Sequence, residues 1–210
     1  MNSITGAAAM ALASLSESQT RFLQTLSKAE LHAHLNGSIP ISCLQRLAQE
    51  RRLEPEGLSE SVSKGLEILD RGIELESIDD FFRLFPAIYA LISSPRALTI
   101  VTREVLAQFL LPGPDGSPAQ CEYIELRTTP RATQYMTRQE YLVTVLDVID
   151  TFGNDKAALL VSVDRRMAAE DIQECVDLAI SLKDQGRHVV GLDLCGDPTV
   201  CILRGIRRPA

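Results

Sequence analysis

Two histidines one residue apart give this chain its clearest chemical signal. His32 and His34 lie in a short apolar run that ends at a polar Asn-Gly-Ser turn, residues 36–38. In a β-strand, residues i and i+2 point to the same face, so both imidazoles would project together where the strand ends. Imidazole nitrogens are common ligands of zinc. The spacing indicates two positions of a metal site, although two polar side chains at a strand exit would show the same pattern.

Polar residues also follow three other apolar segments of the chain. They are the hydroxyls and guanidinium of residues 128–131, the carboxylate of Asp164, and the flexible backbone at Gly196. Hydroxyls and a bidentate guanidinium suit a phosphate, but a capped turn with a surface arginine has the same composition. Asp164 could accept hydrogen bonds from a ligand or pair with Arg165 or Arg166. Gly196 could admit a ligand close to the backbone or only form a turn.

The apolar pattern predicts the elements that must position these residues. Strands are expected over 29–35, 121–127, 157–163 and 189–194, and helices over 40–53, 79–92, 96–111, 137–152 and 168–185, with residues 54–77 as short helical pieces and loop. Near-continuous apolar strands separated by helices predict an α/β fold with a parallel sheet covered by helices. The carboxyl ends of such strands lie at one edge, where functional residues gather. His188 precedes the fourth strand, so we expect it at the opposite edge and without a site role.

Composition narrows the possible partners and the cellular compartment. The 210 residues carry a formal net charge of −7 and no basic stripe, which disfavours nucleic-acid and membrane-surface partners. No apolar run approaches the roughly 20 residues that a membrane-spanning helix needs. The five cysteines are odd in number and form no CxxC pair, which indicates reduced thiols and a cytoplasmic protein. Residues 1–25 are expected to form a flexible or helical leader.

Four segments in order resemble the adenosine/AMP deaminase family, and most closely its adenosine deaminase-like branch, which acts on N6-methyl-AMP. They are residues 28–38, 125–131, 163–166 and 191–198. The resemblance implies a metal-dependent hydrolase with a (β/α)8 TIM barrel. It also implies a zinc-dependent hydrolytic deamination, at purine C6, of adenosine or of an AMP that can carry an N6 substituent. Phosphoesterases and other amidohydrolases also place two such histidines on a first strand, but they would lack the second and fourth segments.

The resemblance assigns roles to the matching residues. His32 and His34 would bind one zinc ion. Substrate contacts would come from His34, Asn36, Tyr89, Thr128, Thr129, Pro130, Arg131, Asp164 and Gly196. Residues 128–131 correspond to the segment that holds the substrate 5′-phosphate, and Tyr89 stands where this branch often has a histidine. The implied partner is a purine nucleoside or nucleoside monophosphate, and the family members are often monomeric.

The family draws its remaining zinc ligands and its general-acid glutamate from later strands, and no segment here matches those. The catalytic residues are therefore unknown. Residues 26–199 are expected to form only about the first half of the barrel, strands one to four, followed by an atypical tail over 200–210. This predicts an incomplete zinc ligand set, impaired activity and possible self-association, with inward-facing side chains left uncovered, among them Leu159 and Val161 or Val190 and Leu192. The alternative is a non-catalytic truncated chain that acts through association with another chain.

Overall fold

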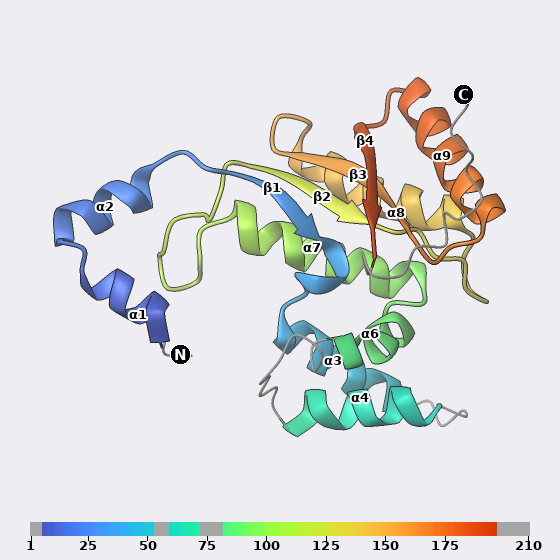
Figure 1. The fold of residues 1–210 in the computed structure, drawn as a ribbon, viewed down its shortest axis with the longest axis horizontal. Helices are drawn as coiled ribbons and strands as arrows, with labels where there is room; N and C mark the ends of the chain where they lie inside the picture. Colours follow the sequence, from blue (N-terminus) through green and yellow to red (C-terminus); the bar gives the residue numbers. More distant parts are fainter. Residues whose placement is uncertain (1–5, 53–58, 72–81, 197–210) are drawn as a thin grey trace, which may run out of the picture.

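A computed structural model describes residues 6–52, 59–71 and 82–196 of the chain. Its centre is a four-stranded sheet (Figure 1). The strands are β1 (Ala29–His34), β2 (Tyr123–Thr128), β3 (Ala157–Asp164) and β4 (Val189–Cys195). Each pairs in parallel with the next, in the order β1-β2-β3-β4. The prediction of an α/β fold with a parallel sheet is confirmed.

Helices connect the strands. A 3-10 turn, η1 (Leu35–Gly37), follows β1, and the helices after it are α3 (Ile41–Arg52), α4 (Glu60–Arg71), α6 (Phe85–Leu91), α7 (Pro95–Leu110), α8 (Arg138–Phe152) and α9 (Ala169–Asp184). Helix α8 packs on β3, and α9 packs on β3 and β4. Local signals set several ends: Ser94 and Thr137 cap α7 and α8, and Thr137 forms the predicted capping box with Glu140.

Side-chain alternation gives the sheet a buried face and an open face. Ile124, Leu126 and Thr128 of β2 are buried on the helix side, whereas Arg127 lies between them on the other side. In β3, Leu159 and Val161 are fully buried and share the helix side with Leu126 and Thr128 through the strand register. The prediction that Leu159 and Val161, or alternatively Val190 and Leu192, face inward was therefore wrong. Leu160 and Ser162 point to the open face, and Leu192 pairs in register with Val161 on the helix side.

Two helical segments differ from the sequence prediction. Residues 54–77 were expected to form short helical pieces and loop, and the described part, residues 59–71, is almost entirely the single helix α4, which buries Leu66 and Leu69. Within the expected helix over 79–92, Phe82 and Arg83 are helical, Leu84 forms a turn, and α6 follows over Phe85–Leu91. Residues 79–81 lie outside the described residues. Pro86 accounts for the break at Leu84, because it has no N–H to donate to the carbonyl four residues earlier.

The amino-terminal segment stands apart from this layer of helices (Figure 1). Helices α1 (Gly6–Ala13) and α2 (Glu17–Thr25) form the described part of the predicted leader, and α2 buries no side chain. The predicted tail over 200–210 lies outside the described residues. Within the described ranges, none of the helices combines the length and the apolar character that a bilayer span requires. The domain boundaries at residues 25 and 199 stay predictions.

Candidate active site at the carboxyl edge of the sheet

The two histidines of β1 lie side by side where the strand ends. Their ring centroids are 5.3 Å apart, and the ring planes are tilted by 47°. His34 is partly buried and pairs in register with Arg127 of β2. Burial lowers the pKa of His34, and the positive charges of His32 and Arg127 act in the same direction, against the opposing effect of Asp193. His34 therefore favours the neutral imidazole, the form that binds a metal ion.

The residues present fit part of a zinc site. Two adjacent imidazoles supply two of the four ligands of a tetrahedral zinc centre. Among the described residues, no group of three or more histidine, cysteine, aspartate or glutamate side chains is arranged to hold a metal ion. The pair is thus compatible with zinc, but the part of the chain that the structure describes does not complete the ligand set.

Asn36 carries the clearest sign of an absent partner near this pair. It lies in η1, two residues after His34, and its buried side-chain Oδ1 has no hydrogen-bond partner among the described residues. Buried polar atoms in folded proteins are almost always hydrogen-bonded, because an unpaired one keeps its full desolvation cost. The orphaned oxygen marks a place where a ligand donor would be stabilised.

The side chains of Thr128, the last residue of β2, and of Thr129 lie on opposite sides of the sheet. The Thr128 side chain is 2% exposed, lies on the helix side, and shares a 2.7 Å hydrogen bond with the Tyr141 hydroxyl. Burial raises the pKa of Tyr141 to about 12, so this phenol stays neutral. The Thr128 hydroxyl is thus engaged on the helix side of the sheet, and its substrate contact stays a prediction. Thr129 lies on the open side, with its Oγ1 3.4 Å from the Cys195 sulfur.

The next two residues turn the chain over the sheet edge. Pro130 is buried, and the Arg131 side chain is exposed. The Arg131 guanidinium carbon sits 3.7 Å from the centroid of the Tyr89 ring of α6, which is a cation–π contact. Tyr89 and Arg131, two residues predicted to contact the substrate from segments far apart in the sequence, thus lie in direct contact with each other.

Asp164 and Gly196 meet at the ends of β3 and β4. The Asp164 carboxylate accepts hydrogen bonds from the Arg166 Nε at 2.9 Å and Nη2 at 2.6 Å, so of the two neighbouring arginines it pairs with Arg166. Its contact with a substrate stays a prediction. These bonds lower the pKa of Asp164, while its partial burial acts in the opposite direction. Gly196 has a φ of +96°, and a Cβ there would lie 2.7 Å from an Asp164 carboxylate oxygen. Only glycine fits this position without strain.

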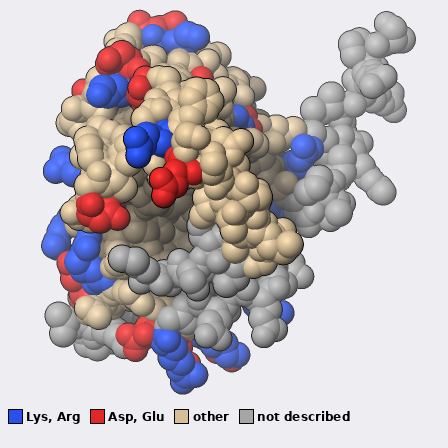
Figure 2. All heavy atoms as spheres, turned by 90° about the vertical axis from the view of Figure 1, so that its left-hand side faces the viewer, with Lys and Arg blue, Asp and Glu red and all other residues tan. Residues whose placement is uncertain are grey.

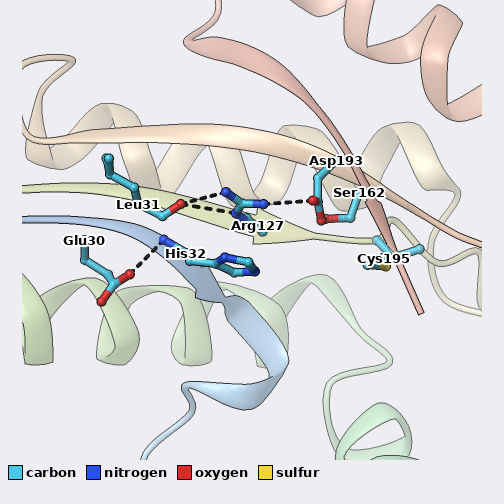
Figure 3. Close-up of polar contacts among 8 residues, drawn as sticks. Glu30, Leu31, His32, Arg127, Ser162, Asp193 and Cys195 are labelled. Atoms are coloured by element: carbon cyan, nitrogen blue, oxygen red, sulfur yellow. Dashed lines mark hydrogen bonds and ion pairs between the residues drawn. The ribbon is translucent and has the colours of Figure 1, made fainter. Parts of the chain in front are cut away.

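An ion pair on the open face ties the four strands together, and sequence reasoning missed it (Figure 3). The Arg127 guanidinium of β2 contacts Asp193 Oδ1 of β4 at 2.8 Å, and its Nη2 donates to the Leu31 carbonyl of β1 at 2.8 Å. The Ser162 hydroxyl of β3 donates to Asp193 Oδ2 at 2.9 Å. A single polar residue inside an otherwise apolar strand, as at Ser162 and Asp193, was the signal available for finding it.

Other side chains do not join this site. His188 lies at the opposite edge, as predicted, with its Nδ1 2.8 Å from the carbonyl oxygen of Ala157. On the face seen in Figure 2, basic and acidic side chains are interspersed and form no single basic patch. The exclusion of nucleic acid stays a prediction.

Comparisons with known proteins give the context of this geometry. The family model described as adenosine deaminase matches residues 27–202. The human N6-methyl-AMP deaminase is 35% identical over 191 residues, which cover 87% of this chain and 49% of that protein. The Arabidopsis thaliana N6-mAMP deaminase is 32% identical, over 85% of this chain and 54% of that protein. The chain thus spans about half the length of the curated relatives it matches.

Solved structures agree with the sequence comparison. The crystal structure of Arabidopsis ADAL complexed with IMP superimposes with a TM-score of 0.70 at 32% identity, covering 87% of this chain and 53% of that one. A Burkholderia amidohydrolase with bound Zn, 19% identical with a TM-score of 0.60, shares the fold. The predicted barrel fold, with strands β1–β4 of its eight, is confirmed. From these matches and the carboxyl-edge site, we conclude that this chain belongs to the adenosine deaminase family.

Proposed function

We propose that this chain carries the first part of the active site of a zinc-dependent deaminase for purine nucleoside monophosphates, with an N6-substituted AMP as substrate. The observation that carries the proposal is the joint position of the His32–His34 pair and Arg131 at the carboxyl edge of one sheet. Nitrogen ligands for a metal and a cation for a phosphate are the two needs of this reaction that these residues can meet.

The overall reaction consumes one water and replaces the C6 amine by oxygen. For N6-methyl-AMP the products are IMP and methylamine. A zinc ion held by His32 and His34 would make hydroxide available at neutral pH. Arg131 would bind the 5′-phosphate, and the buried Asn36 Oδ1 would accept a hydrogen bond from the substrate. Because Gly196 has no side chain, the substrate can approach the backbone next to Asp164.

We expect the 210-residue chain by itself to be impaired. The described residues supply two imidazoles and no further metal-ligand cluster, so zinc would be held more weakly than by a full set of four. No glutamate has been identified as the general acid. The proposal therefore predicts nucleotide and zinc binding, with little or no turnover.

The second candidate is a non-catalytic role through association with another chain. The observation in its favour is that β4 lies at the edge of the described sheet and exposes three apolar side chains, Val190, Leu192 and Leu194. These residues alternate with Asp193, so they lie on the side of the sheet opposite the ion pair. Unpaired strand edges with apolar side chains favour association.

We propose the cytoplasm as the compartment, since the four cysteines in the described ranges are free.

Metal analysis and calorimetry on the purified chain test the proposal. We expect about one zinc per chain and measurable IMP binding, with zinc lost in the H32A/H34A double variant. His188→Ala is the matched control, because its ring lies at the opposite edge and should leave zinc content unchanged. Absence of both zinc and IMP binding would overturn the proposal. A family-like deamination rate would refute the expected impairment, and a stable oligomer without either ligand would favour the second candidate.

A further inference from the structure

Arg131 differs from Arg127 and Arg166, two arginines at the same edge of the sheet, in how it is held. The Arg127 and Arg166 guanidinium groups pair with carboxylates, at 2.8 Å and 2.6 Å. For Arg131, the structure shows no ion pair or side-chain hydrogen bond to any described residue, and its guanidinium instead stacks over the Tyr89 ring. Stacking uses the flat face of the group and leaves its N–H donors, which lie in the plane, unengaged.

The Tyr89 ring is a fixed surface for this stack. Helix α6 buries Ile88 and Leu91 in the core, which holds its backbone against the rest of the domain. The Phe85 ring, one helical turn earlier, meets the Tyr89 ring edge to face, with centroids 5.4 Å apart. Burial raises the pKa of the Tyr89 phenol, so the ring stays uncharged at neutral pH.

The backbone around Arg131 is anchored to the same helical layer. Pro130 is buried, and the Thr133 hydroxyl donates a 2.8 Å hydrogen bond to the Ser93 carbonyl, in the turn between α6 and α7. The loop is thus held on both sides of Arg131. Its position over Tyr89 is therefore set by backbone anchoring as well as by the attraction between cation and ring.

We propose that Tyr89 is a positioning residue for Arg131, holding the guanidinium so that its free N–H edge binds the phosphate of a nucleoside monophosphate. The inference rests on the proposed function and deepens it. It replaces the expected direct substrate contact of Tyr89 by an indirect one through the stacked arginine. Phosphate selectivity would then depend on the aromatic face at residue 89 and not on its hydroxyl group.

Calorimetric titration of the full chain with IMP and with inosine tests this, because the two ligands differ only in the 5′-phosphate. Tyr89→Leu removes the ring at similar bulk, and we expect it to weaken IMP binding about tenfold, the effect of a partly desolvated cation–π contact. Inosine affinity should change less than about twofold. Tyr89→Phe keeps the ring and should restore the preference for IMP, and Arg131→Met should abolish it.

Two further variants separate positioning from a general structural effect. Tyr135→Leu makes the same change at an exposed tyrosine and should leave both affinities as in the parent chain. The Y89L/R131M double variant should bind IMP no more weakly than R131M alone, because both changes act on one interaction.

The outcomes distinguish this inference from the proposed function. If the parent chain binds neither ligand, the proposed function fails and the inference with it. If the parent chain prefers IMP and Y89L keeps that preference, only the inference fails. Equal weakening of IMP and inosine by Y89L, or a loss in Y89F as large as in Y89L, would likewise overturn it, by showing a structural role or a direct contact of the hydroxyl.

Discussion

Replacing Asp193 by alanine should destabilise the folded chain by about 3 kcal/mol, the lower end of the range for breaking a buried ion pair. The Asp193 side chain is 14% exposed and accepts charge-assisted hydrogen bonds from Arg127 and from Ser162. Its removal leaves the Arg127 guanidinium, 17% exposed, with only the Leu31 carbonyl as a described partner. We take the lower end because neither charge is fully withdrawn from water.

Urea unfolding followed by circular dichroism measures this loss. With an m-value of about 2 kcal/mol/M, a loss of 3 kcal/mol lowers the midpoint by about 1.5 M. Asp193→Asn keeps the shape and one acceptor, so its midpoint should fall between those of the parent chain and D193A.

A matched control uses an ion pair of equal length on the surface. Asp147 meets Arg187 at 2.8 Å, but its side chain is 63% exposed, and Arg187 also pairs with Asp150. Asp147→Ala should therefore cost less than about 1 kcal/mol. If D193A and D147A shift the midpoint equally, burial does not set the strength of the Arg127 pair, and the reasoning is refuted.

Three further changes follow from the same geometry. Gly196→Ala should destabilise the chain by about 1–3 kcal/mol in urea unfolding and weaken IMP binding, whereas Gly186→Ala, also at positive φ but with open space around it, should cost less and leave binding intact; equal effects would exclude a clash with Asp164. Thr128→Val should cost about 1–3 kcal/mol by orphaning the Tyr141 hydroxyl, and adding Tyr141→Phe should recover part of it; strictly additive losses in a double-mutant cycle would argue against the hydrogen bond. The hydrogen bonds from Arg166 lower the pKa of Asp164, so the stabilisation that its carboxylate provides is complete above the unfolded-chain pKa of about 3.9 and is lost as the pH falls through the lower folded pKa. The difference in unfolding free energy between the parent chain and Asp164→Asn should therefore be constant from about pH 5 to 7 and shrink below about pH 4. A difference that is unchanged in acid would contradict this.

The strands and most helix ends were predictable because they follow from local periodicity and capping. The two-residue alternation of side chains along β2 also showed which face Thr128 lies on, and the sequence interpretation did not use it. Thr128 continues the two-residue spacing of Ile124 and Leu126, which places its hydroxyl on the helix side. Pro86 likewise marked the turn at Leu84 before α6. Both features were set by local signals that were present in the sequence.

Contacts between side chains far apart in the sequence could not be predicted from local patterns. Arg127 reaches past β3 to Asp193 on β4, and that contact depends on the register and twist of three strands. Asp164 could pair with either of two neighbouring arginines in the sequence, and only the turn after β3 selected Arg166.

The sequence by itself determined that two imidazoles share a strand end, that polar residues follow each of four strands, and which family these segments resemble. Those features depend on residue types and short spacings, because a regular strand or helix fixes the direction in which each side chain points. The tertiary structure decided that the Arg131 guanidinium stacks on the Tyr89 ring and that Arg127 forms an ion pair with Asp193. It also decided that the side chain of Thr128 points away from the open face of the sheet. Such contacts depend on how helices dock on the sheet, because packing sets distances between segments that the linear order leaves open.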